Sequence, residues 1–318
     1  MTSRLKLPLC LLALLAFAVP ATAQAKYSVG IGEQNAAVFD NAAWKSAKLK
    51  RIRVMVPWDW QKQGYQISET TNWMNRARAA KQDVLVAFTA RRGCYTNGKY
   101  AKRKKACKAP STSAYRKQFR AFDKAFPWVK TYSAWNEINH VSQPTYKSPK
   151  KAAQYYNVLR GDCRKRKCKV MAADLLDTSN MLSYLRKFKR YAKGSPTLWG
   201  LHNYQDVNRH TSADTLSLLR NVRGQVWLTE TGGFMGFGKH FKRSSKRQVK
   251  ATKWMFKLAD RYDSRRNGAK AKLTRLYVYS WFGISKQKGN PFDAGLVNPD
   301  GSTRSAYKTF KAKARKHR

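Results

Sequence analysis

Two short segments of the sequence each end in a glutamate, and their residue types indicate a common chemistry. Residues 132–140 read YSAWNEINH and residues 227–233 read WLTETGG. Each begins as an aromatic and β-branched run and ends among polar or glycine residues, which is typical of a buried strand that leads into a loop. Glu137 and Glu230 therefore lie at the ends of predicted strands. Two carboxylates brought together in this way are the usual equipment for cleaving a glycosidic bond.

The spacing of these two glutamates predicts how the strands are arranged. They are 93 residues apart, and one strand–helix unit takes about 30 residues. The spacing therefore places three strand–helix units between them on one sheet. The other glutamates of the chain are Glu33 and Glu69. Because glutamate is so scarce, finding half of these residues at strand ends argues that Glu137 and Glu230 are more than ordinary solvent-exposed side chains.

Strand-like and helix-like segments alternate along the chain, which favours a parallel α/β sheet. The expected strands cover residues 27–31, 51–56, 83–89, 128–135, 169–173, 198–201, 225–229 and 273–280. The expected helices cover residues 41–50, 70–81, 114–126, 149–160, 181–191, 215–222 and 248–261, with a last helix near the C-terminus. This pattern predicts one (β/α)8 TIM barrel over residues 24–318. A doubly wound open sheet is the alternative, but Gly30-Ile31-Gly32 is too short for its glycine-rich phosphate loop.

The N-terminal residues 1–23 have the pattern of a secretory signal peptide. Arg4 and Lys6 precede an apolar run over residues 7–19, and Ala21-Thr22-Ala23 matches a cleavage site. A membrane anchor is the alternative, but the run is shorter than the ~20 residues needed to span a bilayer. We therefore expect a secreted protein, either extracellular or held in the periplasm or cell wall, and we expect it to be a monomer.

The cysteines agree with export. Cys10 lies in the predicted signal peptide, and the other cysteines are Cys94, Cys107, Cys163 and Cys168. An even number in an exported protein predicts disulfides, for which three pairings are possible. We favour the two local pairings, Cys94 with Cys107 and Cys163 with Cys168, because each closes a short polar loop. A four-cysteine zinc site is disfavoured by the absence of CxxC spacing.

The net charge is +48, and removal of Arg4 and Lys6 leaves +46. Such a charge attracts polyanions, so an anionic cell-wall polymer, an acidic polysaccharide or a nucleic acid are candidate partners. The lysines and arginines are spread over the chain, so a merely solvated surface is the competing interpretation. If a polyanion is bound, its retention should weaken as salt rises, whereas recognition of a neutral glycan should hardly change.

In a barrel of this kind, the strand ends open on one face and build the active site there. Aromatic rings beside carboxylates suit a sugar, which has apolar ring faces and hydroxyl edges. His140 and His202 do not form an HExxH or similar metal motif, so we expect no metal and no cofactor. The residues expected at the mouth are Trp58, Asp59, Trp60, Trp135, Asn136, Glu137, His140, Asp174, His202, Tyr204, Glu230 and Trp281.

The segments Trp135-Asn136-Glu137 and Thr229-Glu230-Thr231-Gly232 resemble the acid/base and nucleophile motifs of a known clan. This clan comprises retaining β-glycoside hydrolases with a (β/α)8 barrel and catalytic glutamates on strands four and seven. The C-terminal segment, 292–307, also resembles the way in which many such domains end. The resemblance covers the layout of the mature chain, but in residue detail only these short motifs.

The resemblance implies a role for individual residues. Glu137 would be the general acid/base and Glu230 the nucleophile, and the charge of one would raise the pKa of the other. Asn136 would bind the hydroxyl beside the anomeric carbon, Tyr204 would hold Glu230, and Trp281 would form the floor of the cleavage subsite. Trp135, His202 and Trp58 complete the expected substrate-binding set, although packing in the core or at the rim is the alternative for Trp58 and Trp60. Asp174 is expected to be structural or a subsite contact.

Two positions depart from the pattern of the clan. Ile138 stands where many members have proline after the acid/base. The arginine often found near the end of strand two has no clear counterpart, because Arg51 and Arg53 lie at the start of that strand. These departures bear on the exact family and substrate more than on the chemistry.

The sequence thus predicts a secreted retaining β-glycosidase that acts on a β-linked polysaccharide. A non-catalytic protein that binds a glycan or a cell-wall polyanion on the same fold is the alternative, although an inactive site has no reason to keep both glutamates. A secreted nuclease is a weaker third possibility, suggested by charge alone.

Overall fold

The computed structural model describes residues 27–96 and 98–317. Its main sheet is entirely parallel, in the order β7-β6-β3-β2-β1-β11-β10-β9-β8. The strands are β1 (Ser28–Gly32), β2 (Arg51–Pro57), β3 (Asp83–Thr89), β6 (Thr131–Ser133), β7 (Lys169–Met171), β8 (Asp174–Leu176), β9 (Leu198–His202), β10 (Gly224–Thr231) and β11 (Ala271–Tyr279). The predicted signal peptide, 1–23, lies outside the described residues.

Strands β7 and β8 are two halves of the fifth barrel strand, and they close the sheet on itself. β7 pairs with β6 and β8 pairs with β9. Between them, the Ala172 amide donates to the Leu198 carbonyl at 2.9 Å, and the Gly200 amide donates to the Ala173 carbonyl at 2.7 Å. The described strands therefore occupy eight barrel positions, which confirms the predicted (β/α)8 barrel.

A glycine on β9 makes room for the second half of the fifth strand. A Cβ atom at Gly200 would lie 2.3 Å from Asp174 Oδ1 and 2.4 Å from Met171 Sδ. No side chain fits at such distances, so the interior position of Asp174 depends on this glycine.

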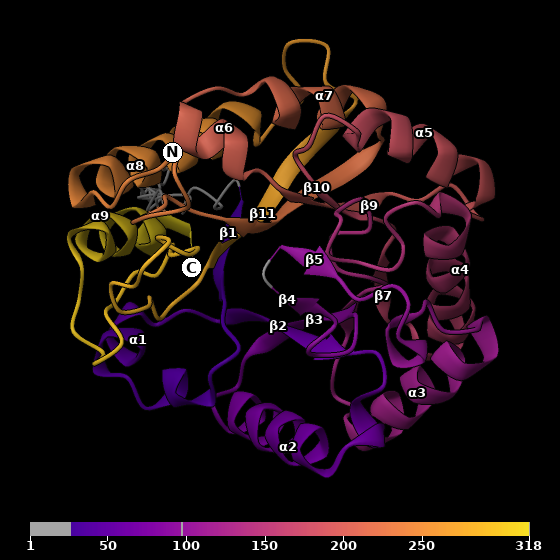
Figure 1. Cartoon of the computed structure of the whole chain (residues 1–318). Coiled ribbons are helices and arrows are strands. Elements are labelled where there is room, and N and C mark those ends of the chain that lie inside the picture. Colours follow the sequence, from indigo (N-terminus) through magenta and orange to yellow (C-terminus); the bar gives the residue numbers. More distant parts are fainter. Residues whose placement is uncertain (1–26, 97, 318) are drawn as a thin grey trace, which may run out of the picture.

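Helices surround the barrel as an outer ring (Figure 1). They are α1 (Ala42–Ala47), α2 (Gly64–Ala79), α3 (Thr112–Ala125), α4 (Pro149–Arg166), α5 (Met181–Tyr191), α6 (Tyr204–Arg209), α7 (Ala213–Asn221), α8 (Ser245–Tyr262) and α9 (Ser305–Ala314). Their apolar residues recur at helical spacing and face the sheet, as Tyr115, Phe119 and Phe122 do on α3. The Ser111 hydroxyl caps α3 by accepting from the Ala114 amide at 3.1 Å.

Several predicted boundaries differ from the structure. Helix α2 covers Gly64–Ala79, so it begins six residues before the predicted helix over 70–81. The predicted strand over 128–135 is reduced to β6, because the chain turns at its start, where the Val129 amide donates to the Phe126 carbonyl at 3.1 Å. Helix α6, directly after β9, was not predicted.

Two disulfides form as predicted, Cys94–Cys107 and Cys163–Cys168. The first clamps a loop that contains the hairpin of β4 (Tyr95–Thr96) and β5 (Lys99–Tyr100), which lies over the barrel opening in Figure 1. The second joins the end of α4 to the residue before β7. None of the described helices is long and apolar enough to cross a membrane.

Candidate active site

Glu230 lies near the end of β10, a strand of eight residues, and only 5 % of its surface is exposed. Its Oε1 accepts a hydrogen bond from Arg53 Nη1 at 2.7 Å. Its Oε2 accepts one from the Tyr204 hydroxyl at 3.1 Å. Both carboxylate oxygens are thereby fixed in position by side chains from two other parts of the barrel.

Glu137 lies in the loop that follows β6, and its backbone is in the left-handed region with φ of 44°. The residues on either side are tied to neighbouring strands. The Asn136 amide donates to the Phe88 carbonyl at 2.7 Å, and the Ile138 amide donates to the Asp174 carbonyl at 3.0 Å. These bonds hold a turn that a non-glycine residue seldom adopts, and they direct the Glu137 side chain toward the barrel axis.

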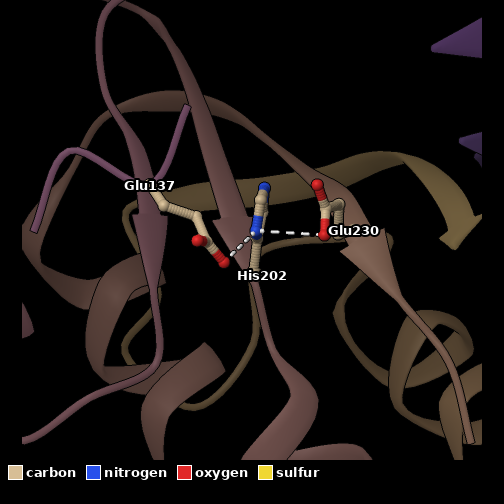
Figure 2. Close-up of side chains that lie close together, drawn as sticks. All are labelled: Glu137, His202 and Glu230. Atoms are coloured by element: carbon tan, nitrogen blue, oxygen red, sulfur yellow. Dashed lines mark hydrogen bonds and ion pairs between the residues drawn. The ribbon is translucent and has the colours of Figure 1, made fainter. Parts of the chain in front are cut away.

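His202 lies between the two glutamates (Figure 2). Its Nδ1 is 3.0 Å from Glu137 Oε1 and 3.5 Å from Glu230 Oε2. One oxygen of each carboxylate and a ring nitrogen of His202 all lie within 4.8 Å of one another. The imidazole, which is fully buried, thus bridges the two carboxylates.

A second layer of charge lies beneath this trio. Asp174 is fully buried on β8, and its Oδ2 accepts from Arg53 Nη2 at 3.1 Å and from the Ser133 hydroxyl at 3.2 Å. Its Oδ1 accepts from the Thr229 hydroxyl and lies 3.3 Å from His202 Nε2. Asp174 is therefore a structural anchor for Arg53 and His202 rather than a wall of the site.

These contacts determine which groups are charged. Burial lowers the pKa of His202, but the charges of Glu230 and Asp174 outweigh it and raise the pKa to about 10. Burial raises the pKa of Asp174, but His202 and Arg53 lower it to about 2. At neutral pH the buried cluster therefore contains two cations, Arg53 and His202, facing the carboxylates.

The pKa of Glu137 corrects an expectation. Its neighbour's charge was expected to keep it protonated, yet its pKa is lowered. Burial acts to raise the pKa, but hydrogen bonds from His140 and His202 more than compensate. His140 Nδ1 is 3.4 Å from Glu137 Oε2, whereas His202 contacts Oε1. The two imidazoles together stabilise the carboxylate, so the proton of the resting site is held on His202.

Two cavities meet at Glu137. The larger has a volume of about 810 Å³, and the smaller has a volume of about 410 Å³. Met55, Asn136 and Glu137 line both. The larger cavity extends toward α2 and the hairpin and is lined by polar and charged residues that include Glu69, Arg91, Arg92 and Tyr95. The smaller contains Glu230 and an aromatic wall made of Tyr204, Phe234, Phe237, Phe241, Tyr279 and Phe292.

Comparison with known proteins bears directly on this arrangement. Residues 104–310 match the model of the glycosyl hydrolase catalytic core family. The chain belongs to this family. It is therefore a glycoside hydrolase, and the resemblance to retaining β-glycoside hydrolases with a (β/α)8 barrel is confirmed. A search of curated proteins finds no match.

Solved structures of glycoside hydrolases share the fold of this hydrolase at low identity. GH5_18 from Streptomyces cattleya, in complex with Manb1-4GlcNAc, is 12 % identical with a TM-score of 0.65, over 92 % of this chain and 81 % of that chain. A GH113 β-1,4-mannanase is 12 % identical with a TM-score of 0.54, over 91 % and 99 %. A family 17 β-1,3-glucanosyltransferase from Rhizomucor miehei is 11 % identical with a TM-score of 0.55, over 88 % and 96 %.

The structure brings most of the predicted site residues of this hydrolase together, but not the tryptophans. Trp281 is fully buried and packs against Trp44 and Tyr307, so the expectation that it forms the floor of a sugar subsite is wrong. Trp135 is also buried, stacked on Tyr155 with ring centroids 4.8 Å apart. Trp58 is 7 % exposed, with Lys62 Nζ 4.9 Å from its ring, and lines neither of these cavities.

Three residues of the site were missed from the sequence. Arg53 takes the place of the arginine that the clan often has near the end of strand two. It lies on the inner face of β2 beneath Glu230. Tyr279 lines the smaller cavity, where Trp281 was expected. Glu33 follows β1, and its Oε2 accepts from the Trp281 and Phe282 amides at 3.0 and 2.9 Å, which fixes the chain after β11.

The trio of Glu137, His202 and Glu230 has the donor atoms and the spacing to hold a metal ion. Its surroundings disfavour one, because Arg53 Nη1 is already 2.7 Å from Glu230 and the Nε2 side of His202 faces Asp174. A further cation would add to the positive charge of Arg53 and His202. The donor set therefore fits proton transfer better than metal binding.

Proposed function

We propose that the protein is a secreted retaining β-glycosidase that cleaves a β-linked polysaccharide with Glu230 as nucleophile and Glu137 as general acid/base. The observation that supports this most directly is the proximity of the two carboxylates, which have oxygens within 4.8 Å of each other. Retaining enzymes hold the two groups ~5–5.5 Å apart, whereas inverting enzymes leave ~6.5–9.5 Å for a water molecule.

Glu230 is suited to attack. Its carboxylate is paired with Arg53 and hydrogen-bonded to Tyr204, and these two contacts hold it in one orientation. In the first step an oxygen of Glu230 forms a bond to the anomeric carbon as the glycosidic bond breaks. Asn136 lies beside both cavities, where it would bind the neighbouring hydroxyl of the sugar.

Glu137 and His202 together supply the proton that the departing oxygen needs. At rest the proton is held on His202, with Nδ1 3.0 Å from Glu137 Oε1. As negative charge develops on the departing oxygen, the proton moves from His202 to Glu137, and Glu137 protonates that oxygen. In the second step Glu137 removes a proton from water, which attacks the anomeric carbon and releases Glu230. Glu137 then returns this proton to His202 through the same 3.0 Å contact, which restores the resting site.

Both cavities are lined by Glu137, which supports a polymeric substrate because a chain cleaved there could extend into either cavity. The solved neighbour from Streptomyces cattleya binds Manb1-4GlcNAc, a β-linked glycan. The aromatic wall of the smaller cavity offers faces on which sugar rings can pack. We propose that the sugar attacked by Glu230 occupies this smaller cavity.

The setting of the enzyme is also a proposal. The predicted signal peptide and the two disulfides support export. The mature domain would be residues 24–318, acting as a monomer, and its positive charge would hold it on an anionic cell-wall polymer.

Two measurements test the reaction. The protein is first incubated with a panel of β-glucans, mannans, xylans and galactans, and released reducing ends are measured. On the best substrate, NMR then identifies the anomer released first, and we expect the β-anomer. A first product with inverted configuration would contradict the retaining mechanism.

A third measurement tests the nucleophile. A 2-deoxy-2-fluoro glycoside with a good leaving group should trap the glycosyl-enzyme, and peptide mass spectrometry should locate the sugar on Glu230. The control is Asp300→Ala, which removes an exposed carboxylate from the loop before α9 and should label normally. A protein that binds the glycans but neither cleaves them nor becomes labelled would be the non-catalytic binding protein instead.

A further inference from the structure

A strongly basic loop follows Tyr95, a residue that lines the larger cavity. No aspartate or glutamate occurs between residues 84 and 122. Within this stretch, the disulfide loop and the residue that follows it present six exposed cationic side chains, which we call the basic loop: Lys99, Lys102, Arg103, Lys104, Lys105 and Lys108. In the part of the chain that the structure describes, none of these six side chains has an ion-pair partner.

The two arginines at the base of the loop differ from the basic loop in this respect. Arg91 is paired with Asp59, and Arg92 is paired with Glu69. These arginines line the larger cavity, and their charges are balanced locally. The unpaired charge of this stretch is therefore concentrated on the basic loop, which belongs to the same disulfide loop as the cavity residue Tyr95.

The backbone of the loop is fixed before any ligand binds. Cys94 is bonded to Cys107, and the Ala101 amide donates to the Cys94 carbonyl at 2.8 Å. The Tyr100 hydroxyl donates to the Cys107 carbonyl at 2.6 Å. A fixed loop loses little conformational entropy on binding, so its charges are available to a ligand at small cost.

The loop is also connected to the catalytic acid. Tyr95, on the hairpin, lines the larger cavity together with Glu137. The ring centroid of Tyr95 is 6.2 Å from that of His140, and His140 Nδ1 is 3.4 Å from Glu137 Oε2. A glycan chain that leaves Glu137 through the larger cavity would therefore pass Tyr95 and reach the basic loop.

We propose that the basic loop binds the anionic groups of a glycan whose neighbouring sugar occupies the larger cavity, so that the substrate is an acidic polysaccharide. This deepens the proposed function, on which it rests for the identity of the bound glycan as substrate. Carboxylate, sulfate and phosphate groups share the required charge. The exposed lysines would recognise them mainly by Coulomb attraction, which depends on salt.

The test compares two forms of one soluble β-glucan, unmodified and carboxymethylated. Binding is measured on the Glu230→Ala protein, so that no cleavage occurs, over a range of salt concentrations. The loop variant carries Lys102→Gln, Arg103→Gln, Lys104→Gln and Lys105→Gln. The matched control removes the same charge from the outer helix layer with Lys250→Gln, Lys253→Gln, Lys257→Gln and Arg261→Gln, all exposed on α8.

At low salt we expect the parent to bind the carboxymethylated glucan at least about tenfold more tightly than the neutral one. The loop variant should lose most of this preference. Its slope of log affinity against log salt should fall by up to about 3, because each cation that pairs with an anionic group contributes ~0.7 to the slope. The control should keep both the preference and the slope. A sulfated form of the same glucan distinguishes the kinds of anionic group.

Three outcomes would overturn the proposal: no preference for the charged glucan, an equal loss in the α8 control, or equally tight, loop-dependent binding of a DNA duplex. The last would mark a general polyanion surface. Binding is measured without cleavage. If no glycan were hydrolysed, the proposed function would be refuted, but the binding measurement would still decide whether the basic loop binds anionic glycans. All substituted side chains are exposed, and matching melting temperatures would show that the variants are folded.

Discussion

The two glutamates that we propose as catalytic are held in very different ways. Glu230 belongs to a strand of eight residues, and its partners are Arg53 and Tyr204. Glu137 follows a strand of three residues, has a left-handed backbone, and contacts two histidines. Its side chain is 17 % exposed, whereas that of Glu230 is 7 % exposed.

This difference matches the different tasks of the two groups. A nucleophile has to remain ionised and correctly oriented, and permanent donors in a rigid barrel provide this. A general acid/base has to gain and lose protons, so it benefits from partners that titrate and from access to water. Substitutions of Glu230 and of Glu137 should therefore reduce activity to different extents.

The largest effect on activity is expected from removing the Glu230 carboxylate. Glu230→Ala should abolish turnover, by roughly 10⁵-fold or more, because the group that bonds to the anomeric carbon is removed. Single-turnover assays on the best glycan of the panel measure this. Asp300→Ala should leave the rate unchanged. A Glu230→Ala protein with full activity on a natural glycan would refute the assignment.

A smaller effect, which depends on the substrate, is expected from removing the Glu137 carboxylate. Glu137→Ala should slow cleavage of natural glycans by roughly 10²–10⁴-fold. Glycosides with very good leaving groups need no proton and should be nearly spared. The ratio of the rates on the two substrate types, compared between parent and variant, gives the result. An equal loss on both would mean that Glu137 is not the acid.

His202 connects the two sides, and its titration should appear in stability. Because its pKa is raised from 6.5 to about 10, protonation of His202 stabilises the fold fully below pH 6.5. The free energy of unfolding should therefore fall as pH rises toward 10, by the order of a few kcal/mol. Urea unfolding measured across this range tests it.

The control for this experiment uses a different histidine. His202→Gln should give a flatter dependence of unfolding free energy on pH above 6.5. His240→Gln, at an exposed position, should leave the dependence as in the parent. If all three proteins show the same decrease, the protonated imidazole does not contribute to the stability of the site.

The smallest effects are expected from the disulfides. From the loop lengths, replacing both cysteines by serine should lower the free energy of unfolding by about 3 kcal/mol for Cys94–Cys107 and about 2 kcal/mol for Cys163–Cys168. Only the first disulfide holds the hairpin beside His140, so only its loss should also raise KM. Denaturant unfolding and steady-state kinetics separate the two effects. Equal changes in KM would contradict the link between hairpin and site.

Much of the barrel could be predicted because the fold repeats one strand–helix unit with a strong apolar pattern. Strand β3 and helix α5 have the predicted bounds, since β-branched and apolar runs between charged residues define them clearly. Glu137 and Glu230 could be found because each follows such a run. The shortened β6 and the divided fifth strand could not, since both depend on pairing with neighbouring strands.

Arg53 and Trp281 show why parts of the site were missed. Strand alternation places Arg51, Arg53 and Met55 on one side, and an arginine buried there requires carboxylates. That pattern was present in the sequence but was discounted because Arg53 lies early in the strand. Trp281 was judged by residue type, but β11 ends at Tyr279, so alternation no longer governs where Trp281 points.

Gly200 gives the barrel a position of low mutational tolerance that carries no chemical group of its own. A methyl group there would displace Asp174, on which Arg53 and His202 both depend. In a saturation library selected for activity, this glycine should be as invariant as the two glutamates, whereas exposed lysines of the outer helix α8 should vary freely. A search for catalytic residues by mutational sensitivity alone would therefore identify Gly200 as catalytic, although its role is to leave room for the Asp174 side chain.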